Sequence, residues 1–408
     1  MPRVSHYSIS REREVVASTA ESGEGDRFQT GGVVTLSVGH AVHDAYASFL
    51  APLLPAFIAK LALSKTQAGV LSFLQSSPSL LQPFIGYLAD RVSFRYIVIL
   101  APAVTATMMS LLGTAPGYGV LALFLAVGGI SSAAFHSAAP VAAGRLAGRS
   151  LGRGMGVWMM GGSLGFGVGP ILIVSALSIL GLEGTPWLMI GGWLASVLLY
   201  LRLRDLPRRR RATAELGSWR QGLQAMRPIL LPVVGITLAR ALLASALFTF
   251  LPTFLIEQGS SLWFAGISLS VLQVAGMIGA LAGGSLSDKL GRRLILFVST
   301  VTAPLLMFLF LGVEGWAGLP VLLLLGVTGP STRAVLLALV QESCPSNRAL
   351  ANGIYLGQAF VAESGSAVVV GLLGDLFGLH VAFVTSAVIL LLGLLFVPLL
   401  PERRISEI

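Results

Sequence analysis

The sequence predicts an all-α integral membrane protein with twelve transmembrane helices in two six-helix, pseudo-symmetric halves. The first reason is composition: 55% of the 408 residues are hydrophobic, 11% are charged, and the mean hydropathy is +0.84. A soluble domain is usually about 25% charged, so apolar surface on this scale needs lipid as its solvent. The second reason is a repeat with a period of nearly half the chain, which indicates two related halves rather than a solenoid of short units.

Twelve apolar spans follow one another from residue 33 onward, each long enough for a bilayer that needs about 20 helical residues. Their predicted limits are 33–59, 66–89, 95–114, 117–143, 151–180, 185–203, 229–256, 262–287, 293–313, 317–342, 347–375 and 379–400. The remaining segments are a disordered tail over 1–32, without a signal peptide, an Arg-rich linker over 204–228 and a tail over 401–408. Residues 216–226 predict a short interfacial helix that carries Trp219.

Most of the 27 basic residues fall on one side of these spans, which predicts that both termini are cytoplasmic in a cell (inner or plasma) membrane. The net charge of +9 then reflects orientation and contact with anionic lipids. A nucleic-acid partner is not expected, because no basic patch is interleaved with aromatic residues in a folded domain. The single cysteine, Cys344, excludes an intramolecular disulfide.

The repeat is clearest in one short polar segment between apolar runs. Residues 284–293 read GSLSDKLGRR, and residues 86–95, which lie 198 positions earlier, read GYLADRVSFR. This segment resembles the loop signature G-x-L-x-D-x-x-G-R-[RK] of the major facilitator superfamily. The second copy fits at every position, and the first departs at Ser93 and Phe94. The resemblance implies gating roles for Gly86, Asp90, Arg91, Arg95, Gly284, Asp288, Lys289, Gly291, Arg292 and Arg293.

Ionisable residues inside the spans are candidate functional residues, because a charge at mid-bilayer costs about 2.5–3.5 kcal/mol on insertion scales. They are His40, His43, Asp44, His136, Arg240, Arg333 and Glu363. The superfamily fold implies that spans one, four, seven and ten line a central cavity. Six of the seven residues are therefore expected to face that cavity.

Two roles divide these residues. His40 and Asp44 share a helix face at i and i+4, and an imidazole beside a carboxylate suits proton coupling, with Glu363 as a further candidate. A structural contact between helices is the alternative. His43 and Asp44 are expected to diverge on the helix, so neither a metal nor a cofactor is predicted. Arg240 and Arg333, with His136 and His43, are expected to bind an anionic substrate, the alternative being that the arginines pair with Asp44 or Glu363.

A glycine pattern in the fifth span resembles the antiporter motif of drug exporters in the superfamily. It comprises Gly156, Gly165, Gly169 and Pro170, although Ile173 and Val174 replace the final glycine pair of that motif. A stripe of glycines for helix packing explains the spacing equally well.

Short matches narrow the resemblance to the fosmidomycin resistance exporters: Gly39-His40 with Asp44, Leu-Gln-Pro at 81–83, Phe135-His136 and Gln341-Glu342. The resemblance implies a proton-coupled antiporter that exports small anionic or amphipathic molecules, expected to act as a monomer in contact with lipids. A proton-coupled nutrient importer and a non-transporting sensor are the alternatives. The sequence has no Walker loop, nucleophile elbow or zinc pattern, so an enzyme is not predicted.

Overall fold

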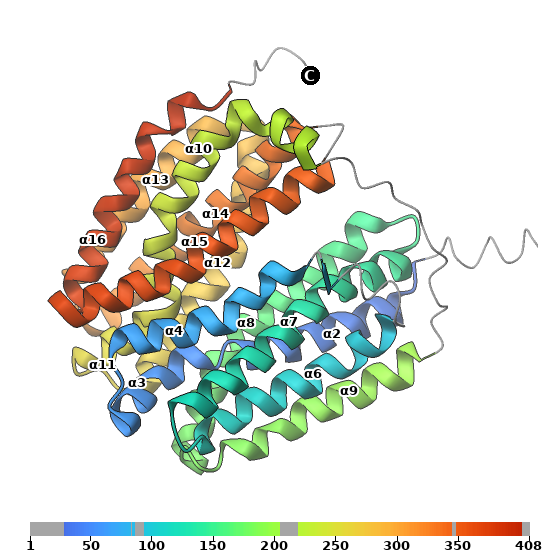
Figure 1. The fold of residues 1–408 in the computed structure, drawn as a ribbon, viewed down its shortest axis with the longest axis vertical. Helices are drawn as coiled ribbons and strands as arrows, with labels where there is room; N and C mark the ends of the chain where they lie inside the picture. Colours follow the sequence, from blue (N-terminus) through green and yellow to red (C-terminus); the bar gives the residue numbers. More distant parts are fainter. Residues whose placement is uncertain (1–27, 83, 86–93, 205–218, 345–347, 402–408) are drawn as a thin grey trace, which may run out of the picture.

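The structure, a computed structural model, describes residues 28–82, 84–85, 94–204, 219–344 and 348–401. Regular secondary structure in these residues is helical throughout, and the helices form two bundles, one from each half of the chain (Figure 1). The predicted all-α fold in two halves is therefore confirmed. The N-terminal tail up to residue 27, linker residues 205–218 and the motif residues Gly86, Asp90 and Arg91 lie outside the described residues.

The first bundle begins with a bent span. Its helix is interrupted at Ser48 and Phe49, because Pro52 lacks the N–H that would bond to the Ser48 carbonyl. The bounds in this bundle are α2 Thr30–Ala47, α3 Leu50–Leu61, α4 Lys65–Ser76, a 3-10 turn Ser77–Leu81, α6 Phe94–Leu111, α7 Tyr118–Ala147, α8 Leu151–Leu180 and α9 Met189–Leu203.

The second bundle begins with a helix that starts earlier than predicted, at Trp219. Its bounds are α10 Trp219–Ser245, a π-helical turn Ala246–Phe250, α11 Leu251–Glu257, α12 Leu262–Leu290, α13 Arg292–Leu311, α14 Gly318–Ser343, α15 Arg348–Phe377 and α16 Leu379–Leu392. Residues 219–226 are the first turns of α10 and not a separate interfacial helix. The side chain of Met226 is buried in an apolar cluster with residues of α14 and α15, the helices on which α10 packs.

Eleven helical segments in the described residues are long and apolar enough to cross a membrane. Each of these segments falls on a predicted span. The second predicted span, 66–89, is the one without such a segment in the described residues. There α4 ends at Ser76 and gives way to the 3-10 turn that contains Pro78, so the expected continuous helix is not formed. Pro78 lacks the N–H that would continue the α-helical hydrogen bonds.

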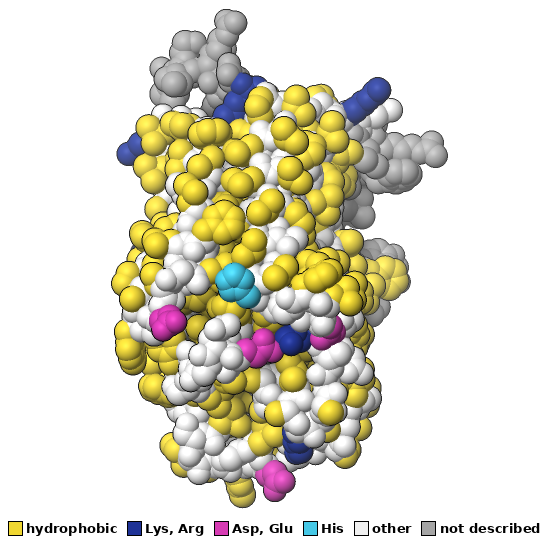
Figure 2. Space-filling model, turned by 90° about the vertical axis from the view of Figure 1, so that its left-hand side faces the viewer, with side chains coloured by type: hydrophobic (Ala, Val, Ile, Leu, Met, Phe, Trp, Pro, Cys, Tyr) yellow, Lys and Arg dark blue, Asp and Glu magenta, His cyan; other side chains and the backbone are white. Residues whose placement is uncertain are grey.

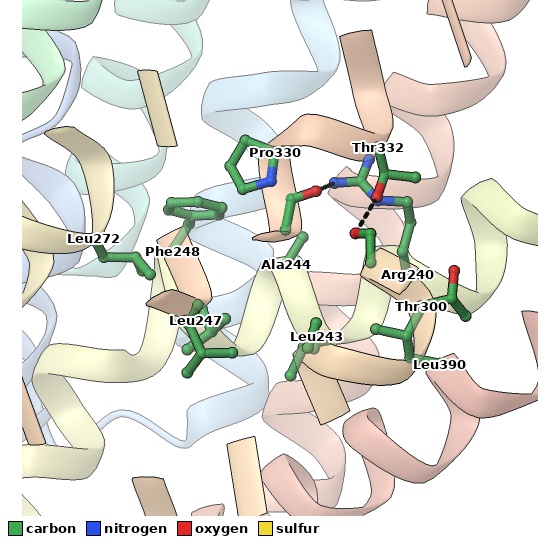
Figure 3. Close-up of a pocket in the computed structure, with 14 residues that line it drawn as sticks. Arg240, Leu243, Ala244, Leu247, Phe248, Leu272, Thr300, Pro330, Thr332 and Leu390 are labelled. Carbon is green, nitrogen blue, oxygen red and sulfur yellow. Dashed lines mark hydrogen bonds between the residues drawn. The ribbon is translucent and has the colours of Figure 1, made fainter. Parts of the chain in front are cut away.

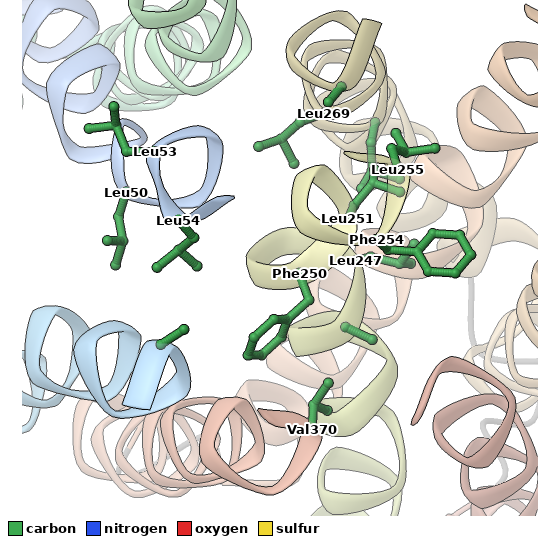
Figure 4. Close-up of a cluster of buried hydrophobic side chains, with 14 of the residues drawn as sticks. Leu50, Leu53, Leu54, Leu247, Phe250, Leu251, Phe254, Leu255, Leu269 and Val370 are labelled. Carbon is green, nitrogen blue, oxygen red and sulfur yellow. The ribbon is translucent and has the colours of Figure 1, made fainter. Parts of the chain in front are cut away.

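The two bundles meet along two helix pairs, α4 with α15 and α8 with α12. Glycines permit the close approach in both: a Cβ on Gly69 would overlap the Ala367 backbone, and one on Gly266 would press on Val174. Beside these pairs, leucines of α3 face Phe250 and Leu251 of the second half, and Val370 of α15 joins them (Figure 4). Apolar packing thus joins the halves at one end of the molecule.

Polar contacts join the halves at the same end, where the turn between α3 and α4 meets the end of α15. The Asp375 carboxylate accepts hydrogen bonds from the backbone N–H groups of Lys65, at 2.7 Å, and Thr66, at 2.8 Å. It also accepts one from the Thr66 hydroxyl, at 2.6 Å. Lys65 Nζ lies 3.0 Å from a carboxylate oxygen of Glu257 in α11. Figure 2 views this end and shows acidic and basic side chains side by side on a largely uncharged surface.

Candidate functional site

A cavity of about 590 Å³ lies between the two bundles. Both halves contribute polar side chains to its wall, among them Gln75, Gln82, Thr105, Ser132, His136, Ser163, Arg240, Gln273, Arg333 and Glu363. Polar and charged groups gathered in a cavity of an otherwise apolar membrane protein mark the place where it binds its ligands. This cavity is therefore the candidate functional site.

A cluster of one carboxylate and three imidazoles lies against the first-half wall of the cavity. Asp44 Oδ2 lies 3.1 Å from His40 Nε2, and Asp44 Oδ1 lies 2.8 Å from His43 Nδ1 and 3.6 Å from His136 Nε2. His40, His43 and Asp44 are at most 3% exposed, whereas the side chain of His136 is 27% exposed and lines the cavity. His136 is thus the member through which the cluster reaches the cavity.

Hydrogen-bond geometry fixes most protons of this cluster. Nδ1 of His40 lies 2.9 Å from the Trp158 carbonyl, and Nδ1 of His136 lies 2.9 Å from the Ser132 carbonyl. Carbonyl oxygens only accept, so both Nδ1 atoms carry hydrogen. The two Nε2 atoms, 3.3 Å apart, then face each other and Asp44 with lone pairs unless a further proton is present. The triangle of Asp44, His40 and His136 therefore needs at least one labile proton.

His43 has a different position in the cluster. Its ring donates from Nδ1 to Asp44, and its Nε2 faces the Thr105 hydroxyl at 3.1 Å. The ring is fully buried and stacks on Phe135 with ring centroids 4.4 Å apart. The expected divergence of His43 and Asp44 is wrong, because the imidazole turns back onto the neighbouring carboxylate. His43 is also closed off from the cavity, so a direct contact with a substrate is not available to it here.

Helix α8 makes room for the cluster with glycines. A Cβ on Gly162 would overlap the His40 ring and the Asp44 carboxylate, and a Cβ on Gly161 or Gly165 would overlap the α2 backbone. The glycine pattern therefore packs α8 against α2 at Gly165 and Gly169, while Gly156 has open space around its Cα. The helix-packing interpretation holds for two of the three predicted glycines, and Gly162, which the pattern omitted, touches the cluster itself.

The second half places three charged side chains on the cavity wall. Arg333 Nη2 lies 3.1 Å from Glu363 Oε2, and its guanidinium lies 5.7 Å from the ring centre of Phe360. In this structure Arg333 therefore forms an internal ion pair with Glu363, which is the alternative to anion binding. Glu363, on span eleven, lines the cavity, whereas His40, His43 and Asp44 do not, so the expectation that six of the seven face the cavity is wrong.

Arg240 is the exception among these charges. It is 9% exposed and donates one hydrogen bond, to the Gly329 carbonyl at 3.0 Å. The described residues give it no ion-pair partner, neither Asp44 nor Glu363. A guanidinium has five N–H donors, so most of those on Arg240 have no protein acceptor and open toward the cavity. A nearly buried, unpaired cation of this kind attracts an anion.

The second copy of the loop motif forms a compact charged turn. Arg292 reaches Asp288 at 2.5 Å and Glu342 of α14 at 2.8 Å, and Gly291 adopts a φ of +94° that favours glycine. Arg293 donates to the Pro398 carbonyl at 2.7 Å, and Lys289 is exposed. Of the first copy, Arg95 donates to the Arg204 carbonyl at 2.6 Å. The second copy, and Arg95 of the first, therefore tie neighbouring segments within their own half.

Only one group of side chains in the described ranges is placed to surround a metal ion. One ligand atom each from His40, Asp44 and His136 lies within 4.8 Å of the others. From the sequence, the metal ligands considered were His40, His43 and Asp44, with His43 in the place that His136 takes in the structure. His40, Asp44 and His136 also form the triangle that needs a labile proton, so a proton and a metal ion are alternative occupants of this group. Thr105, Trp158 and Gly162 were missed from sequence, because a hydroxyl, a backbone carbonyl and a glycine carry no charge signal.

Two related helical bundles with a polar cavity at their interface are the architecture of many secondary transporters. Comparison with known proteins agrees. The family model described as Major Facilitator Superfamily matches residues 36–356, and the chain belongs to this family.

Relatives of known sequence fit the same assignment. The fosmidomycin resistance protein of Escherichia coli (strain K12) is 25% identical over 410 residues, covering 97% of this chain and 99% of that protein. The uncharacterised MFS-type transporter YfnC of Bacillus subtilis (strain 168) is 26% identical over 394 residues, covering 92% and 94%. The expected resemblance to the fosmidomycin resistance family is thereby confirmed.

Solved structures share the fold at low sequence identity. A bacterial homologue of the human lysosomal transporter Spinster, inward-facing and occupied, has a TM-score of 0.78 at 17% identity, covering 91% of this chain and 96% of that one. A D-xylose–proton symporter has a TM-score of 0.73 at 14% identity, covering 92% and 99%. The chain is therefore a multi-pass membrane transporter of this superfamily.

Proposed function

We propose that this transporter is a proton-coupled antiporter that exports small anionic or amphipathic molecules, as a monomer with both termini in the cytoplasm. One observation carries the proposal. A buried cluster that needs a labile proton reaches, through His136, the same cavity that is lined by the unpaired guanidinium of Arg240. Similarity to a fosmidomycin resistance protein supports export as the direction.

The proton part of the proposal rests on the shared position of His136. Its Nε2 is 3.6 Å from Asp44 and 3.3 Å from His40, and its side chain lines the cavity, so Nε2 can take up a proton from the cavity and pass it to Asp44. Histidine is suited to this because its charge changes between pH 5 and 8. A substrate that hydrogen-bonds to His136 removes it from Asp44, which supplies the competition between substrate and proton that exchange requires.

The substrate part rests on Arg240 and the Arg333–Glu363 pair. Arg240 offers free N–H donors for a carboxylate or phosphonate, which a guanidinium binds through two parallel hydrogen bonds. Arg333 is available to a second anionic group when its ion pair with Glu363 opens. Glu363, the carboxylate on the cavity wall, is the second candidate for proton coupling.

Orientation is proposed from charge. Arg145, Arg149, Arg153, Arg292 and Arg293 lie at the helix ends opposite the Asp375 contacts, and short cytoplasmic loops are the ones enriched in arginine and lysine. The end joined by Asp375 then faces the outside of the cell membrane.

Import is the second candidate, and charge in the cavity favours it. An anion at Arg240 and a proton in the Asp44 cluster attract each other, so the two bind more strongly together than apart. Joint binding is the condition for cotransport, which at an inward proton gradient would import the anion. The sign of proton movement on substrate binding therefore separates the two candidates.

The test measures protons on binding. Purified protein in weak buffer with a pH-sensitive dye is mixed with methylphosphonate or a longer amphipathic acid. Release of about one proton per bound ligand supports antiport, and uptake supports cotransport. Asp44→Asn should remove the proton signal and pH-driven transport in vesicles while counterflow exchange continues. Glu183→Gln, which removes an exposed carboxylate in a loop, is the matched control. Unchanged pH-driven transport in Asp44→Asn would refute proton coupling at this cluster.

A further inference from the structure

A small recess adjoins the central cavity inside the second bundle. Its volume is about 30 Å³, and it shares Arg240, Ala244, Phe248 and Pro330 with the wall of the cavity. Beyond Arg240 the recess is lined mainly by apolar side chains from α10, α12, α13, α14 and α16 (Figure 3), chiefly Leu243, Leu247, Leu272, Ala303, Leu325 and Leu390. A charged group and an apolar space thus lie side by side.

The polar groups on the recess wall differ in how many of their hydrogen-bond donors already have a partner within the protein. Ser299 donates to the Thr328 carbonyl at 2.6 Å and lies 2.7 Å from the Thr332 hydroxyl, so these two side chains are satisfied within the protein. Arg240 uses one donor, on the Gly329 carbonyl. The charge at the mouth of the recess is therefore cationic and belongs to one guanidinium, and Thr300 adds a hydroxyl to the recess wall.

From this juxtaposition we infer that the transported anion carries a short, unbranched alkyl group, which occupies the recess while its acidic head pairs with Arg240. The inference rests on the proposed anion site and specifies its substrate. A volume of about 30 Å³ holds about two groups the size of a water molecule, which corresponds to a methyl or an ethyl group. Short-chain alkyl phosphonates and the corresponding carboxylates are the class that fits.

The binding series that tests this uses inorganic phosphate, methylphosphonate, ethylphosphonate and n-hexylphosphonate on the purified full-length transporter, measured by calorimetry. Burial of each methylene is worth about fourfold in affinity, so binding should tighten by about that factor per carbon up to ethyl and weaken again at hexyl. Affinity that is flat or falls from phosphate onward overturns the recess assignment. Absence of binding by all four anions overturns both this inference and the anion site.

Two variants change the recess in opposite directions. Ala303→Val fills it, and should abolish the gain from phosphate to ethylphosphonate while phosphate itself binds as before. Leu247→Ala enlarges it, and should move the optimum to a longer chain. Ala317→Val, at an exposed position that lines neither the recess nor the cavity, is the matched control and should keep the wild-type series. A wild-type chain-length profile in both recess variants would overturn the inference, and Arg240→Gln, which should lose all four ligands, tests the anion site separately.

Discussion

Asp375 provides a direct test of what keeps the two halves together at one end. Its carboxylate accepts two backbone N–H groups and one hydroxyl from the first turn of α4, across the boundary between the bundles. Asp375→Asn keeps the size of the side chain but removes its charge and leaves one oxygen to accept. A carboxylate at a helix N-terminus is worth about 0.5–2 kcal/mol as a cap, and Asp375 is exposed, so the lower half of that range applies.

A loss of about 1 kcal/mol corresponds to about a fivefold change in an equilibrium constant. These contacts exist only while this end is closed, so the population with this end open should rise by about that factor. The assay follows the reaction of a single cysteine at Met277, on the cavity wall, with a membrane-impermeant thiol reagent added from the Asp375 side. Cys344→Ser removes the native thiol, which is buried and whose pKa is raised by that burial.

The labelling rate should increase about fivefold in Asp375→Asn and remain unchanged in Glu183→Gln, an exposed carboxylate at the same end. Labelling from the opposite side should change little, because a fivefold increase in a minor open state barely reduces the major one. An unchanged or slower rate from the Asp375 side would show that these hydrogen bonds do not limit opening, and would leave the apolar cluster around Phe250 as the contact that does.

Three further predictions concern the cluster and the loop motif. Gly162→Ala should impair pH-driven transport strongly, since the new Cβ overlaps His40 and Asp44, whereas Gly156→Ala, which meets open space, should transport normally; equal activity of the two would contradict the packing described for α8. Elemental analysis of purified protein should find no stoichiometric transition metal, and a metal lost in His40→Ala would show that the cluster is a metal site instead. Asp288→Ala should lower the unfolding free energy by less than about 1 kcal/mol, because Asp288 is itself exposed and the buried Arg292 keeps its ion pair with Glu342; a loss of several kcal/mol in chemical denaturation would show that the motif is a structural centre.

The sequence by itself determined the solvent, the class of fold and the residues worth testing. Composition requires lipid, the repeat requires two halves, and charge inside an apolar span is costly enough to single out His40, Asp44, His136 and Arg240. These signals are readable because each depends on residue type and spacing along one chain.

Only the tertiary structure decided which of these residues meet. Arg240 and Arg333 look equivalent in the sequence, yet Arg333 pairs with Glu363 and Arg240 does not, because pairing depends on which face of α15 meets α14. The proton needed by Asp44 follows from two backbone carbonyls that hold the Nδ1 atoms of His40 and His136. Every residue has a backbone carbonyl, and nothing in the sequence distinguishes Gly162 from the other glycines of the chain. The contribution of these groups therefore appears only once the helices pack against one another.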